Sequence, residues 1–114
     1  MELKKLHNLI VEALEDVKGN DLVSIDMSGK LDIIDMMVIA SGTSDRHVQA
    51  LADSVVEKAK KAGATVVGVE KDRSLVLIDL YDIIVHVMLP DTREFYNLEK
   101  LWQLEIPAEK TLTV

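Results

Sequence analysis

A turn of small residues between an apolar run and a helical pattern is the first part of the sequence whose residue types could do chemistry. The segment 39-IASGTSDRHVQALAD-53 passes from aliphatic residues through Ser-Gly-Thr-Ser directly into helical spacing. Turns of this kind between a strand and a helix hold phosphate groups in many nucleotide-binding proteins. The segment is therefore either a nucleotide site or only the start of a helix.

The residues of this turn favour the structural interpretation. Ser44 can cap the helix through its hydroxyl, and Gly42 allows a bend that a Cβ atom would obstruct. Asp45 places a negative charge at the positive helix end, where it would repel a phosphate. No lysine adjoins the turn, and the patterns G-x-x-x-x-G-K-[ST] and G-x-G-x-x-G are both missing. Arg46 and His47 could still contact an anion, so the nucleotide alternative stays open.

Other candidate catalytic groups are poorly placed for a reaction. Nucleotidyl transfer needs carboxylates that share a magnesium ion, and the best pair is Asp79 and Asp82. These two are three residues apart across a strand turn, and we expect them to point to different faces. The histidines lie on different expected elements, at His7, His47 and His86, and no H-E-x-x-H occurs. The sequence therefore predicts no catalytic residue, no metal site and no cofactor.

Composition limits the class of protein. The chain has 114 residues, no cysteine and a net charge of −7. This charge disfavours nucleic-acid phosphates as the main source of affinity and suits a basic protein partner. No apolar run approaches the ~18 residues of a membrane span, and the N-terminal segment is an acid-containing amphipathic pattern unlike a signal peptide. We therefore expect a cytoplasmic protein with no membrane association and no direct nucleic-acid site.

Helical and strand patterns alternate along the chain. Apolar residues repeat at helical spacing in 3–18, 45–62 and 91–102, with Gly19 and Gly63 just beyond the first two segments. Apolar runs indicate strands at 22–27, 36–40, 65–70, 75–80 and 83–89. The order αββαβββα predicts one α/β domain with a single mixed sheet. We expect 103–114 to be a tail that is loose or docks on a partner.

The last two expected strands form a hairpin with two unlike faces. A two-residue turn at Tyr81 and Asp82 would place on one face the aliphatic pairs Leu80–Ile83, Ile78–Val85 and Val76–Val87. The other face is apolar with one acid and one histidine, and it comprises Leu75, Leu77, Asp79, Ile84, His86 and Met88. Either the C-terminal helix covers this mixed face or a partner binds it. Tyr81 disfavours the positive φ of such a turn, and a longer turn would shift the assignment.

Two segments carry a more specific pattern. The segment 80-LYDIIVHVMLPDTREFYNLEKLW-102 combines a turn with Asp, a V-V-H-V-type strand and R-x-x-Y-x-L-E-x-L-W. Residues 42–48 fit G-T-S-x-R-H-V, and 68–70 fit G-V-E. In these motifs the chain resembles the ribosomal silencing factor family, also called the Iojap-like family. The resemblance covers about residues 3–102 and predicts a silencing-factor domain at 1–102.

The resemblance implies a protein that is not an enzyme. The family's fold is similar to that of nucleotidyltransferases but lacks their catalytic carboxylates. Its members bind the large ribosomal subunit through the ribosomal protein numbered fourteen and block joining of the small subunit. They are often homodimers, and organelle relatives assist large-subunit assembly. The resemblance therefore predicts a translational repressor, with an assembly factor without silencing or a nucleotidyltransferase-like enzyme as the alternatives.

The chain departs from the family pattern at two positions of the hairpin. The family commonly has Trp where Leu75 stands and Gly where Tyr81 stands. Leu75 keeps apolar area without the aromatic anchor of an interface hot spot, and an exposed Tyr81 could compensate. We expect structural roles for Arg46, His47, Arg93, Tyr96 and Trp102. We expect partner contacts at Glu70, Asp72, Leu75, Leu77, Asp79, Tyr81, Ile84, His86 and Met88.

Overall fold

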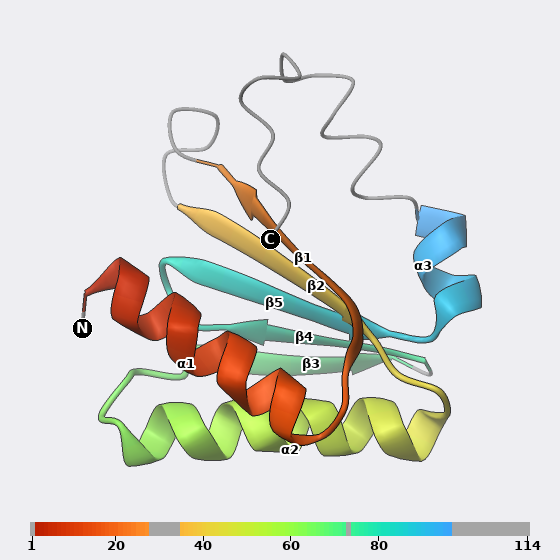
Figure 1. The fold of residues 1–114 in the computed structure, drawn as a ribbon, viewed down its shortest axis with the longest axis horizontal. Coiled ribbons are helices and arrows are strands. Elements are labelled where there is room, and N and C mark those ends of the chain that lie inside the picture. The colour runs from red at the N-terminus through yellow and green to blue at the C-terminus, as the bar shows by residue number, and fades with distance from the viewer. Residues whose placement is uncertain (1, 28–34, 73, 97–114) are drawn as a thin grey trace.

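The protein is built on an open five-stranded sheet with two helices on one face (Figure 1). The computed structural model describes residues 2–27, 35–72 and 74–96. The elements are α1 (Leu3–Asp16), β1 (Asn20–Asp26), β2 (Met36–Ser41), α2 (Asp45–Lys61), β3 (Gly68–Asp72), β4 (Leu75–Asp79), β5 (Ile83–Met88) and α3 (Pro90–Tyr96). The predicted order αββαβββα is therefore confirmed. The expected helix residues 97–102 and the tail 103–114 lie outside the described residues.

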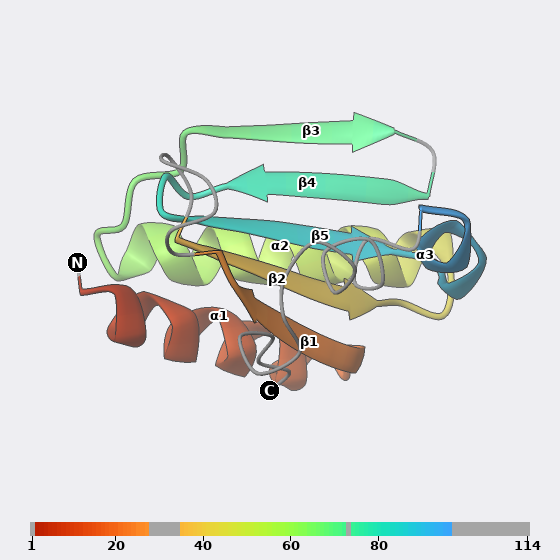
Figure 2. The ribbon, with the colours of Figure 1, turned by 90° about the horizontal axis from the view of Figure 1, so that it is seen from above.

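The sheet is mixed, as predicted. Its strand order is β1-β2-β5-β4-β3, so β1 and β3 are the edges (Figure 2). β2 and β5 run parallel, while every other neighbouring pair is antiparallel. The chain returns from β2 through α2 before β3, β4 and β5 follow. This crossover is what allows β5 to lie parallel to β2 at the centre of the sheet.

Helices α1 and α2 bury their apolar stripes against one face of the sheet (Figures 1 and 2). The helices contribute Leu6, Ile10, Leu14, Val48, Leu51 and Val55, and the strands Val38, Ala40, Val76, Ile78, Val85 and Val87. All these side chains are buried. Among the described residues, no helix combines the length and the apolar character that crossing a membrane requires.

The observed bounds of β3 differ from the predicted ones because of its pairing with β4. Apolar residues predicted a strand at 65–70, whereas the observed strand is Gly68–Asp72 and includes three charged residues. Lys71 pairs with Val76 and Asp72 with Leu75 across the antiparallel ladder to β4. An edge strand tolerates such charges because one side of its backbone and much of its side-chain surface face water. Val67, which the apolar pattern placed inside the strand, is 56% exposed.

The end of α1 also differs from the expected one. Lys18, and not Gly19, adopts the left-handed conformation with φ of 60°. The amide of Gly19 donates to the carbonyl of Leu14 at 2.8 Å, and that of Lys18 donates to Glu15 at 2.9 Å. These two bonds form a Schellman motif, which satisfies carbonyls that the helix would otherwise leave free.

The alternation of apolar and polar residues along β1 predicts that its polar side faces solvent, and the structure shows that it does not. Ser24 is only 3% exposed and faces α1, where its hydroxyl lies 2.7 Å from His7 Nε2. Burial lowers the pKa of His7 below its ordinary value. The hydrogen bond explains how a hydroxyl can occupy the helix-covered face, since a buried polar group is costly only when unpaired.

The β4–β5 turn has the predicted two-residue form. Ile78 pairs with Val85 and Val76 with Val87, as predicted. Tyr81 has a φ of 76°, and the amide of Asp82 donates to the carbonyl of Leu80 at 3.0 Å across it. The amide of Tyr81 itself donates to Asp79 Oδ1 at 2.9 Å. These two bonds stabilise a conformation that a residue with a Cβ atom adopts only at a cost.

Candidate functional site

Four backbone amides in and after the Ser-Gly-Thr-Ser turn donate to groups within the protein. Ser44 caps α2, because its hydroxyl accepts from the amide of His47 at 3.1 Å. The amide of Gly42 donates to Met88 at 3.0 Å, and that of Thr43 donates to His47 Nδ1 at 2.8 Å. The amide of Val48 donates to Ser44 at 2.9 Å, the first bond of the helix. A phosphate-binding turn instead directs such N–H groups at its ligand, so the geometry supports the structural interpretation.

His47 joins two helices and does not project into a pocket as a free ligand. Its Nδ1 accepts from Thr43, so Nε2 carries the proton and donates to the carbonyl of Val17 at 2.6 Å. The imidazole therefore ties the beginning of α2 to the end of α1. Arg46, the neighbouring candidate for an anion contact, is exposed on the surface of α2.

The carboxylates that could have bound magnesium lie on a strand and in the turn that follows it. Asp79 lies on β4, where its Oδ1 accepts from the Tyr81 amide. Asp82 lies in the following turn, and its carbonyl accepts from the amides of Asp35 and Met36 at 2.8 and 3.1 Å. Within the described ranges no three His, Asp or Glu side chains gather closely enough to hold a metal ion.

The sheet face opposite α1 and α2, here called the second face, carries most of the predicted partner contacts. The strand registers place on it Gly68, Glu70, Asp72, Leu75, Leu77, Asp79, Ile84, His86, Met88, Met37, Ile39 and Ile25. Its β1–β2 half is buried, with Ile25 and Ile39 fully so. Its β3–β4–β5 half is partly exposed, and Glu70 and Asp72 at the edge are open to solvent.

The partly exposed half of the second face is aliphatic with an acidic border. We call it the acidic patch, and it consists of Glu70, Asp72, Leu75, Leu77, Asp79, Ile84 and His86. The second-face residues of β3, β4 and β5 in the described chain include three carboxylates and no lysine or arginine. This combination can bury apolar area against a partner while attracting basic side chains at its border.

Two predicted contacts stand apart from the acidic patch. Tyr81 lies in the adjoining turn and is 69% exposed, so it is available to a partner. Met88 is on the second face but is fully buried, in a cluster with Ile25, Met27, Met37 and Ile39. It therefore supports the patch from within, and a partner on the present surface cannot touch it.

His86 is the polar group on the β5 side of the acidic patch. It lies between Ile39 on β2 and Leu77 on β4. Its Nε2 is buried and has no hydrogen-bond partner. Burial lowers its pKa to about 4, so the imidazole is neutral at physiological pH. His86 thus adds no charge to the acidic patch.

The C-terminal helix does not cover the acidic patch along its described length. α3 lies beyond the end of β5 (Figure 2), and Arg93 Nη1 donates to the buried hydroxyl of Ser41 at 2.9 Å. Arg93 therefore makes a hydrogen bond within the protein that links α3 to the end of β2. The side chain of Tyr96 and all of Trp102 lie outside the described residues.

Comparison with known proteins identifies the family. The family model described as "Ribosomal silencing factor during starvation" matches residues 1–113. The Chromobacterium violaceum protein named ribosomal silencing factor RsfS is 44% identical over 95% of this chain and 90% of its own, and the Bacillus subtilis protein of that name is 36% identical over 90% and 88%. The mouse protein named "Mitochondrial assembly of ribosomal large subunit protein 1" is 33% identical over 85% of this chain and 45% of its own.

Solved structures agree with the sequence relatives. A crystal structure of a Chromobacterium violaceum protein has a TM-score of 0.86 and 44% identity, covering 90% of this chain and 87% of the other. A Bacillus halodurans crystal structure has a TM-score of 0.79 and 38% identity, covering 87% and 94%. The shared fold and the match along almost the whole chain lead to one conclusion: the chain belongs to the ribosomal silencing factor family.

Proposed function

We propose that this protein is a translational repressor that binds the large ribosomal subunit and sterically blocks joining of the small subunit. Its family and the names of its bacterial relatives support silencing as the activity. The observation that carries the choice of surface is the acidic patch, an aliphatic area with three carboxylates beside the exposed Tyr81. It acts without a cofactor and is not an enzyme. We also propose, on the family alone, a cytoplasmic location and a homodimeric state.

The partner that fits the acidic patch is a basic protein on the subunit interface, and we propose the large-subunit ribosomal protein numbered fourteen. Leu77 and Ile84 would supply the apolar contact, and Glu70, Asp72 and Asp79 would attract basic side chains around it. Ribosomal RNA would repel a chain of net charge −7, so a protein surface is the favourable dock.

Leu77→Glu is expected to weaken binding to the large subunit about thirtyfold, because it places a charge in the apolar part of the contact. Purified subunits are mixed with the wild-type or variant protein and separated on a density gradient. The wild type should travel with the large subunit and reduce the joined peak, and the variant should do neither at the same concentration. Val67→Glu is the matched control, since Val67 is an exposed aliphatic residue outside the patch.

Two outcomes would contradict the proposal. Undiminished binding by folded Leu77→Glu protein would show that the acidic patch is not the dock. Binding of the wild type to the large subunit with no reduction of joining would favour an assembly factor without silencing, which the name of the mouse relative also suggests. The assembly alternative further predicts preference for precursor particles over mature subunits in the same gradient.

Tyr81→Gly should separate stability from binding. Glycine adopts the observed φ of 76° without strain, so the free energy of unfolding should rise by about 1 kcal/mol. Loss of an exposed aromatic ring beside the patch should weaken large-subunit binding several-fold. Urea unfolding and the gradient assay measure the two effects. If binding is unchanged while stability rises, Tyr81 is not part of the dock.

A further inference from the structure

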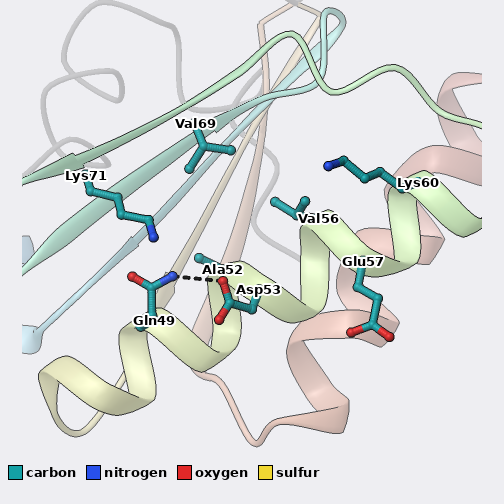
Figure 3. Close-up of a pocket in the computed structure, with 8 residues that line it drawn as sticks. All are labelled: Gln49, Ala52, Asp53, Val56, Glu57, Lys60, Val69 and Lys71. Atoms are coloured by element: carbon teal, nitrogen blue, oxygen red, sulfur yellow. Dashed lines mark hydrogen bonds between the residues drawn. The ribbon is translucent and has the colours of Figure 1, made fainter.

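A second candidate binding surface lies beside β3, on the face of the sheet opposite the acidic patch. An open groove of about 410 Å³ separates α2 from β3 on the helix-covered side of the sheet (Figure 3). Its floor is apolar, formed by Ala52 and Val56 of α2 and Val69 of β3. Val69 is 39% exposed. The groove is therefore separate from the acidic patch, although both share the edge strand.

Two acids and two lysines line the groove. Glu57 pairs with Lys61 at 3.2 Å, and Asp53 accepts from the neutral amide of Gln49 at 2.8 Å. Lys71 and Lys60 lie towards opposite ends of the floor (Figure 3). Neither lysine forms an ion pair with any residue in the described part of the chain. The groove therefore has a lysine towards each end of an apolar floor, an arrangement that suits a segment with acidic residues on both sides of an aliphatic one.

The edge of β3 provides a backbone template along the same groove. β3 pairs with β4 alone among the described strands and ends the sheet. Its side chains alternate, so Val69 and Lys71 face the groove while Glu70 and Asp72 face the second face. A strand added at this edge would therefore meet cations on one side and carboxylates on the other.

We propose that the β3 edge binds an extended segment of a protein partner as an added strand. The segment has alternating chemistry, with acidic and aliphatic residues directed into the groove and basic residues directed towards Glu70 and Asp72. Backbone hydrogen bonds to β3 supply affinity, and the alternation supplies specificity. An aliphatic side chain fills the space between Val56 and Val69, and acids reach Lys60 and Lys71. This interaction goes beyond the proposed ribosome binding, although Glu70 and Asp72 take part in both.

Two synthetic peptides of identical composition test the proposal. Acetyl-Lys-Glu-Lys-Val-Thr-Glu-amide, antiparallel to β3, directs its acids into the groove and its lysines to the second face. Acetyl-Glu-Lys-Glu-Val-Thr-Lys-amide reverses this pattern. Each is titrated into the full-length protein while backbone amides are followed by NMR. The first peptide should shift the amides of β3 and the groove side of α2, with an affinity about tenfold above that of the second.

A charge-reversed protein sharpens the test. The double variant Lys60→Glu with Lys71→Glu should reverse the preference between the two peptides. Lys4→Glu with Lys5→Glu makes the same change of charge on the exposed side of α1 and should leave the preference as it is. Equal affinities for the two peptides, or shifts confined to the acidic patch, would overturn the proposal. So would groove resonances that move with protein concentration and ignore peptide, since a second copy of the chain would then be the occupant.

Discussion

Acidification from about pH 7 to about pH 4.5 should lower the free energy of unfolding by about 2 kcal/mol through His86 alone. The folded protein holds the pKa of His86 at about 4, against an ordinary value of 6.5, because the imidazole is buried. As pH falls through this window, the unfolded chain takes up a proton at His86 while the folded protein does not. Protonation therefore favours unfolding. The contribution of His86 to stability is fully present above the ordinary pKa of histidine, and it is lost as the pH falls towards the pKa of His86 in the folded protein.

His86→Leu should remove this acid-induced loss and should raise stability at neutral pH by about 1 kcal/mol, because Nε2 is buried without a partner. Urea unfolding of both proteins at several pH values measures the difference. The comparison isolates His86, because it is the one titratable group in which the two proteins differ. NMR titration of the His86 ring in the folded wild type gives an independent reading. Parallel stability curves for the two proteins would show that His86 is not kept neutral by burial.

The architecture could be predicted because burial imposes a period on the sequence. Helical spacing in α1 and α2 and the aliphatic pairs of the β4–β5 hairpin each reflect one face turned to the core. The cap at Ser44 is similarly local, since a hydroxyl and an amide three residues later suffice to form it. Features that depend on a few neighbouring residues, or on one regular face, are therefore predictable from the sequence.

Features that depend on distant segments were not predictable. β3 was predicted two to three residues too early, because Lys71 and Asp72 are in the strand through pairing with β4 and no local propensity indicates a strand there. Ser24 is buried because His7 lies over it from α1, although its place in an alternating strand suggested solvent. In each case tertiary contacts outweigh a local preference of modest size.

For the candidate site, the sequence predicts which side chains share one face of the sheet and nothing more detailed. Alternation along β4 and β5 identified the side chains that share the second face, and the registers agree with it. Periodicity cannot say how deeply each one is buried, so Met88 was included although it is fully buried. The groove at β3 combines residues 49–60 with 69–71, and only the folded chain brings these ordinary residue types together. The partner contacts themselves stay predictions.

Gly42→Ala should destabilise the protein by about 3 kcal/mol, which would show why the turn before α2 contains glycine. A Cβ atom at Gly42 would lie 2.9 Å from both the amide nitrogen and Cγ2 of Val48. The nitrogen cannot move away cheaply, because it donates to Ser44 in the first turn of α2 at 2.9 Å. The close approach of helix and turn therefore requires glycine here. This explains the glycine without a bound phosphate.

Gly68→Ala is the matched control for this substitution. A Cβ atom at Gly68 would meet nothing within 4 Å, so its cost should stay within about 0.5 kcal/mol. Urea unfolding of the two variants, with the wild type as reference, measures both effects under one condition. Equal and small losses would mean that the turn can shift to admit a methyl group. Glycine would then need another explanation, and close approach to a bound anion would again be the first to test.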